Sequence, residues 1–259
     1  METKGNKERK ISLDKFVALD DEVRASINLI LSGLHELQCI NGSNDFYHLP
    51  FLILSNGFEK LLKLIICFYH WEQYGEFPKM KDFVDTKNNG HNLLFLKDKV
   101  LVECFKSNTP ALKKDLDILS NNNTLNQIIS FLGEFGQYSR FYNLDIIISN
   151  PSRKSKDIKN LWEKLETELL TKDKSLFEKF KSYLNNINEQ NLKRIEAIND
   201  NVQTKIIILL EIFVRALTRQ FIHGKLGQAQ RFSSVISTFL HLDDNDLGKR
   251  DYKILLSKK

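Results

Sequence analysis

Residues 50–75, PFLILSNGFEKLLKLIICFYHWEQYG, form a long and strongly apolar segment. Pro50 is favoured in the first turn of a helix, and Gly75 is favoured just after the last turn. Between them apolar residues fall on almost every face of a helix, which is typical of a helix buried on all sides. Gly57 costs ~1 kcal/mol in helix propensity, which indicates a close contact with a second helix. The sequence therefore predicts a central buried helix over residues 50–75.

Apolar residues spaced three or four apart continue through most of the chain and predict further helices. The first begins near Asp20, a good N-cap residue, and stops before the Asn-Gly pair at 41–42. Residues 120–124 are expected to form a loop in which Thr124 caps the next helix. The Asn-Asp-Asn run at 199–201 is expected to kink or break the longest pattern. The other predicted helices cover residues 93–104, 110–119, 125–135, 157–171, 174–187, 192–223 and 232–242.

These patterns predict an all-α protein, a bundle of eight or nine helices without a sheet. We expect residues 1–12 to be a disordered tail and residues 13–150 to form an N-terminal helical region. The boundary follows the β-branched run 146–148, where Pro151 and several cations occur. Residues 151–259 are expected to form a C-terminal helical region packed on the first. Alternatively, the two regions form a single domain.

Composition excludes some functional classes. The three cysteines, Cys39, Cys67 and Cys104, lie in apolar patterns without zinc spacing, so we interpret them as buried thiols of a reducing compartment. No phosphate loop, hydrolase elbow or zinc helix occurs, and we expect neither a metal nor a cofactor. The polar N-terminus predicts no signal peptide, and no segment predicts a membrane span, so the expected location is cytoplasmic. A net charge of +5 permits contact with nucleic acid but does not require it.

The end of the longest pattern, RALTRQFIHG at 215–224, carries three candidate functional residues. Arg215, Arg219 and His223 continue a stripe that is apolar one turn earlier, at Ile212. One interpretation is structural, because arginines near a helix C-terminus interact favourably with its dipole. The other is a basic pocket for RNA phosphate, in which His223 takes a proton from a ribose hydroxyl and the arginines stabilise the developing charge.

Two short motifs resemble the HEPN superfamily, helical bundles of bacterial toxin–antitoxin, abortive-infection and CRISPR-associated systems. In many members a Glu-Lys-x-Leu-Lys-like helix precedes a Gly-His-x-Leu segment. The matching residues here are Glu59, Lys60, Leu62, Lys63, Gly90, His91 and Leu93. Within this resemblance Glu59 and His91 are expected to support the fold rather than react, and His91 is expected to cap a helix or lie at the edge of the core.

The resemblance implies a helical domain that often forms a homodimer and often acts on RNA. Catalytic members are metal-independent endoribonucleases with an arginine, four to six residues, and then a histidine. Here three residues separate Arg219 from His223 and seven separate Arg215 from it, so neither spacing matches. The resemblance therefore implies either a metal-independent endoribonuclease of a prokaryotic defence or toxin–antitoxin system, or a non-catalytic interaction module.

Three further cations are candidates for nucleic-acid contact. Arg140 lies in the aromatic segment YSRFYNLD at 138–145, which is similar to an Arg-Tyr segment of some HEPN members. Lys154 and Lys156 begin the Lys-rich region 153–181. A module of this kind is expected to bind either a partner protein or a nucleic-acid backbone. A third alternative is a bundle whose aromatic core encloses a small molecule or a lipid.

Overall fold

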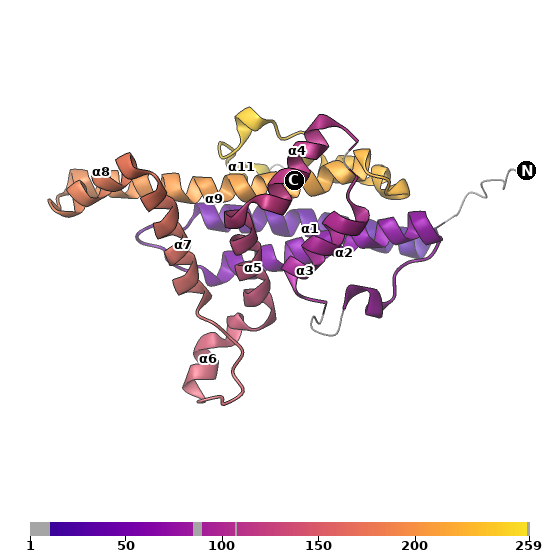
Figure 1. Cartoon of the computed structure of the whole chain (residues 1–259), viewed down its shortest axis with the longest axis horizontal. Coiled ribbons are helices and arrows are strands. Elements are labelled where there is room, and N and C mark those ends of the chain that lie inside the picture. The colour runs from indigo at the N-terminus through magenta and orange to yellow at the C-terminus, as the bar shows by residue number, and fades with distance from the viewer. Residues whose placement is uncertain (1–10, 85–89, 107, 258–259) are drawn as a thin grey trace, which may run out of the picture.

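The computed structural model describes residues 11–84, 90–106 and 108–257, and most of these residues are helical (Figure 1). Eleven α-helices are present among the described residues, and eight of them have at least eight residues. No β-strand occurs in these ranges, where Asn41 and Asn44 form an isolated bridge. The predicted all-α bundle is confirmed. Most of the predicted disordered tail, residues 1–10, lies outside the described part.

The centre of the bundle is a pair of long helices, α1 (Leu13–Gln38) and α2 (His48–Tyr74), which lie side by side in Figure 1. A Cβ atom at Gly57 would lie 3.0 Å from the backbone nitrogen of Ile30, so the helices approach closely at this glycine, as predicted. Helix α2 ends at Gly75, whose φ of 76° is the left-handed conformation that glycine adopts without strain. The predicted central helix is therefore observed, with its start two residues earlier.

The remaining helices surround this pair. Their bounds are α3 Leu93–Lys99, continued by a π-helical turn Val100–Cys104, α4 Pro110–Asn121, α5 Asn123–Gln137, α6 Tyr142–Ile147, α7 Ile158–Lys172, α8 Lys174–Leu184, α9 Glu189–His223, α10 Ser233–Leu240 and α11 Tyr252–Ser257. The predicted loop at 120–124 is wrong, because only Asn122 separates α4 from α5. The Asn122 side chain accepts a hydrogen bond from the backbone N–H of Leu125 and caps α5, whereas Thr124 lies inside it.

Helix α9 runs through the whole molecule as one continuous helix of 35 residues (Figure 1). The predicted break at 199–201 does not occur. Ile198 and Val202 flank this run and are buried against α7 and α8, so packing holds the segment helical. Helix α9 ends before Gly224, where a Cβ atom would lie 2.4 Å from the carbonyl oxygen of Gln220.

One large core occupies the body of the bundle. It takes residues from α1 and α2, and also Trp162 of α7 and Phe213 of α9, so it extends across the sequence boundary at residue 150. A second, smaller core around Leu170, Ile198 and Val202 holds α7, α8 and the first part of α9 together as an arm. None of the helices in the described ranges is both long and apolar enough to span a membrane.

Candidate functional site

Two arginines of α9 meet a buried carboxylate of α4. Arg215 and Arg219 are four residues apart and leave the same face of the helix. Arg219 Nη1 donates a hydrogen bond to Asp115 Oδ2 at 2.8 Å, and Arg215 Nη2 lies 3.8 Å from Asp115 Oδ1. Arg215 Nη1 also lies 2.6 Å from Oδ1 of Asp244. The positive charges of both arginines therefore face carboxylates of the same chain.

These groups form an ion-pair network that is closed to solvent around Arg215. The side chains of Arg215 and Asp115 are only 2% and 1% exposed. At the surface, Lys114 Nζ lies 2.9 Å from Asp244 Oδ2. The hydrogen bonds from Lys114 and Arg215 lower the pKa of Asp244 to about 2. The network ties α4 and the segment after α10 to α9, and an RNA phosphate near Arg215 would have to replace these carboxylates.

His223, the third candidate of the same stripe, is the last residue of α9 and is exposed. Arg219 is partly exposed, at 22% of its side chain, whereas Arg215 is not accessible. The structure therefore brings the two arginines together around Asp115 and leaves His223 outside this network. These contacts support a structural role for Arg215.

Glu59 and His91, one from each of the two HEPN-like motifs, are in contact. His91 Nδ1 lies 2.9 Å from Glu59 Oε1, and the same oxygen accepts a hydrogen bond from Lys63 Nζ at 2.7 Å. Helix α3 is capped by Asn92, whose side chain accepts from the backbone N–H of Phe95, so His91 precedes the cap. The contact joins the surface of α2 to the start of α3.

The three other predicted cations, Arg140, Lys154 and Lys156, are all found on one lobe, residues 138–156, which projects from the bundle with α6 at its tip (Figure 1). Asp145 links the two sides of the lobe. Its carboxylate accepts hydrogen bonds from Ser155 Oγ at 2.6 Å and from the side-chain amide of Asn150 at 2.8 Å. These bonds hold the two sides of the lobe together.

Cations of the lobe lie over its own aromatic rings. The guanidinium of Arg140 is 4.9 Å from the ring centre of Phe141, and that of Arg153 is 5.3 Å from the ring centre of Tyr142. Lys156 Nζ lies 3.1 Å from a carboxylate oxygen of Glu134, at the base of the lobe. The lobe therefore combines aromatic and basic groups.

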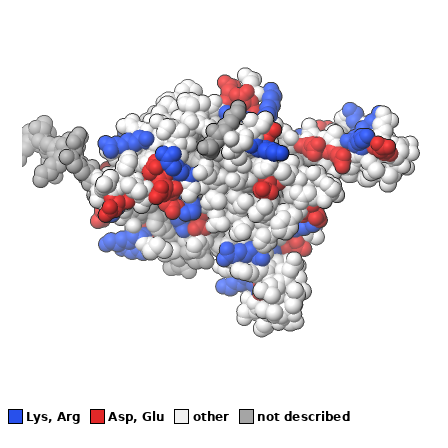
Figure 2. Space-filling view, turned by 180° about the vertical axis from the view of Figure 1, so that it is seen from behind, with Lys and Arg blue, Asp and Glu red and all other residues white. Residues whose placement is uncertain are grey.

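Large apolar side chains at the tip of the lobe are exposed. The exposed fractions are Phe141 48%, Leu144 53%, Ile146 48%, Ile147 76% and Ile148 61%. In Figure 2, which shows the molecule from behind, the lobe at the lower edge is mostly uncharged surface, with Lys and Arg atoms where it joins the body. A group of large exposed apolar side chains is typical of an interaction site.

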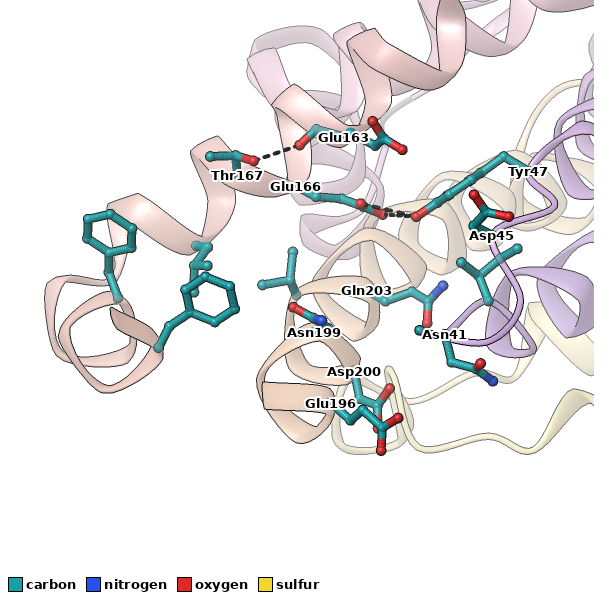
Figure 3. A pocket seen from close by; sticks show the side chains of 16 residues that line it. Asn41, Asp45, Tyr47, Glu163, Glu166, Thr167, Glu196, Asn199, Asp200 and Gln203 are labelled. Carbon is teal, nitrogen blue, oxygen red and sulfur yellow. Dashed lines mark hydrogen bonds between the residues drawn. The ribbon is translucent and has the colours of Figure 1, made fainter. Parts of the chain in front are cut away.

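A cavity of about 360 Å³ lies between the arm and the connection from α1 to α2 (Figure 3). Carboxylates dominate its polar lining. They are Asp45, Glu163, Glu166, Glu196 and Asp200. The sequence did not predict this cavity, because its lining comes from residues 40–47, 163–180 and 196–203, each of which reads as an ordinary helix or turn on its own.

Glu166 is the most enclosed carboxylate of this cavity. Its oxygens accept hydrogen bonds from the hydroxyl of Tyr47 at 3.2 Å and from Nε1 of Trp162 at 3.0 Å. Burial disfavours the charged form and raises the pKa of Glu166 to about 7, although the two hydrogen bonds act in the opposite direction. Glu166 therefore changes its charge near neutral pH.

We expect the Glu166→Gln variant to gain stability relative to the wild type as the pH rises from 5 to 8. The pKa of Glu166 is raised from 4.5 to about 7 on folding, so its contribution to stability is complete below pH 4.5 and is lost as the pH rises through 7. Glutamine does not ionise, so the variant does not lose stability in this way. Urea unfolding of both proteins at several pH values measures the difference, with Glu168→Gln, an exposed position of the same helix, as control. A difference that does not vary with pH contradicts the assignment.

Comparison with protein-family models, with curated proteins and with solved structures finds no match to this chain. The resemblance to the HEPN superfamily thus rests on the short motifs, and what it implies about RNA and dimer formation stays a prediction.

Proposed function

We propose that this protein is a non-catalytic helical interaction module that binds a protein partner through the 138–156 lobe. The partner surface that fits the lobe is an apolar groove bordered by carboxylates. The observation that carries the proposal is the group of exposed apolar side chains at the tip, together with the cations beside them.

The apolar tip supports a protein partner rather than RNA. Leu144 and the three isoleucines 146–148 are aliphatic and exposed, and burying such side chains contributes roughly 1.5–3 kcal/mol each. RNA offers phosphates, hydroxyls and base edges, and its bases stack on aromatic rings rather than on aliphatic chains. Aromatic residues and arginine, which the lobe also carries, are enriched at the centres of protein interfaces.

The charge of the lobe supports an acidic partner. Residues 138–156 contain four cations and one carboxylate, a net charge of +3. Asp145 is engaged within the lobe and Lys156 pairs with Glu134, so Arg140, Arg153 and Lys154 supply the positive charge offered to a partner. A symmetric contact between two such lobes would bring the cations of both copies close together. A homodimer through this surface is therefore disfavoured, whereas carboxylates at the rim of a partner complement it.

The arginine network supports the non-catalytic form of this proposal. Asp115 and Asp244 face the guanidinium of Arg215, and their charges compensate the cation that a ribonuclease would use to stabilise the transition state. The exposed His223 lies outside this network.

The test begins with a photo-crosslinking amino acid at Ile147, introduced into the chain in its native host. A protein crosslinked at this position is identified, purified and titrated with the purified chain by calorimetry. We expect Ile147→Asp, and separately Arg153→Glu with Lys154→Glu, to weaken the affinity by about 30-fold, the effect of losing an interface residue worth ~2 kcal/mol.

The matched control is Ile187→Asp, which places the same charge at another exposed isoleucine, between α8 and α9. Binding that falls equally in this variant contradicts the proposal. So does crosslinking of Ile147 mainly to RNA or to a second copy of the chain. Cleavage of RNA by the purified wild type in EDTA, abolished by His223→Ala with unchanged circular dichroism, would support the endoribonuclease instead.

A further inference from the structure

We propose that the acidic cavity between the arm and the α1–α2 connection binds an aliphatic polyamine, a flexible chain with several ammonium groups. The cavity lies apart from the 138–156 lobe, and the inference does not depend on the function proposed for that lobe.

The cavity has the size and lining of a ligand site. Its volume of about 360 Å³ is within the range of small-molecule pockets, roughly 300–1,000 Å³. Leu170, Phe177 and Phe180 provide apolar and aromatic surface on one side, and carboxylates provide the polar groups. Figure 3 shows Glu166 and Tyr47 on one side of the opening and Glu196 and Asp200 on the other. A bound chain would contact both kinds of surface at once.

The charge of the cavity selects a cation. Five carboxylates line it, and four of them lie outside the enclosed position of Glu166, whose pKa is raised to about 7, whereas the chain as a whole has a net charge of +5. Lys159 pairs with Asp45 and lies 3.9 Å from Glu163, so one cation offsets part of this charge. A cleft lined by charges of one sign concentrates the opposite charge.

Two of the carboxylates have no ion-pair partner among the described residues. Glu196 and Asp200 are four residues apart on α9, an arrangement in which like charges repel and destabilise the helix. Neither forms an ion pair within the ranges that the structure describes. A bound cation would remove this repulsion.

An amide in the cavity wall has an acceptor oxygen that no described residue uses. Gln203 is 8% exposed, and its Nε2 donates to the carbonyl oxygen of Leu37 at 2.5 Å. Its Oε1 accepts no hydrogen bond from the described residues, and the side chain lines the cavity. An ammonium group supplies donors only, and this oxygen and the carboxylates are all acceptors.

The distribution of the carboxylates favours an extended cation over a metal ion. In the described part of the chain, no three His, Cys, Asp or Glu residues gather closely enough to hold a metal. Charges spread along a cavity match ammonium groups that are separated by methylene segments. The methylene segments would lie against Phe177 and Phe180, and an ammonium over such a ring gains a cation–π contact.

The test is calorimetric titration of the whole purified chain with spermidine at low ionic strength. We expect saturable binding with one spermidine per chain and a rise in melting temperature. In the variant Glu196→Gln with Asp200→Asn, the affinity is expected to fall at least about tenfold, because two charge contacts are lost. This variant removes repulsion, so it should fold, and circular dichroism checks this.

The matched control is Glu168→Gln with Glu178→Gln, which removes the same charge from exposed positions of the same arm outside the cavity. Its affinity for spermidine should equal that of the wild type. Two results would overturn the proposal directly: no saturable binding of spermidine to the wild type, or an equal loss of affinity in the control variant. A third test compares magnesium chloride with sodium chloride at the same ionic strength. Complete displacement of spermidine by the magnesium salt, with none by the sodium salt, would also overturn the proposal.

Discussion

Replacing Arg215 with alanine is expected to lower the free energy of unfolding by about 3 kcal/mol, the effect of removing one partner of a buried ion pair. Asp115 is 1% exposed and would keep Arg219 as its single charged partner, while its Oδ1 has no hydrogen bond even in the intact network. The variant also leaves a space where a large side chain was enclosed. Urea unfolding measures the loss.

Lys114→Ala provides the comparison within the same network. Lys114 and its partner Asp244 are 61% and 56% exposed, and exposed pairs contribute at most about 1 kcal/mol. We therefore expect a small loss for Lys114→Ala and a large one for Arg215→Ala. Equal stability of Arg215→Ala and the wild type would show that Arg215 is not structural, and would revive its assignment as a functional cation.

Gly57→Val is expected to destabilise the protein by about 3 kcal/mol, at the upper end of the usual effect of overpacking. A Cβ atom at this position would lie 2.8 Å from Cγ1 of Ile30 and 3.0 Å from its backbone nitrogen, so α1 and α2 would have to move apart. Valine gains some helix propensity over glycine, but by less than ~1 kcal/mol. The midpoint of thermal or urea unfolding measures the effect.

Gly42→Val is the matched glycine. The nearest atom to a Cβ at Gly42 is a carboxylate oxygen of Glu196 at 3.8 Å, an ordinary contact distance. The stability of this variant should stay close to that of the wild type. An equal loss of stability in Gly42→Val and Gly57→Val would contradict this explanation. It would mean that replacing glycine by valine destabilises the protein even where two helices do not approach closely.

Local patterns predicted the helices well where their ends have strong local causes. The helix predicted over residues 50–75 is observed over His48–Tyr74. Both of its signals are local, because apolar periodicity links residues three or four apart and the left-handed Gly75 ends the helix at its own position. The loop at 120–124 was predicted wrongly, since several consecutive asparagines are each able to cap a helix and no glycine or proline decides between them.

Helix α11, near the C-terminus, was not predicted from the sequence, because its local signals are weak. Helix α11 has six residues, too few for a periodic pattern, and its position depends on Tyr252. The hydroxyl of Tyr252 donates to the buried carboxylate of Glu211 at 2.5 Å, and the backbone N–H of Gly248 donates to the other oxygen at 2.6 Å. These partners are far apart in sequence, so no local pattern links them.

The sequence by itself determined that this protein is a helical bundle, that residues 50–75 form its centre, and that Arg215, Arg219 and His223 lie along one stripe of α9. Only the tertiary structure decided that Asp115 and Asp244 face these arginines, that the cations at 140, 154 and 156 share a projecting lobe, and that carboxylates from three segments line one cavity. The physical reason is distance along the chain. Helix periodicity is set by neighbours three or four residues apart, whereas ion pairs and cavities form between residues that meet after the helices have packed.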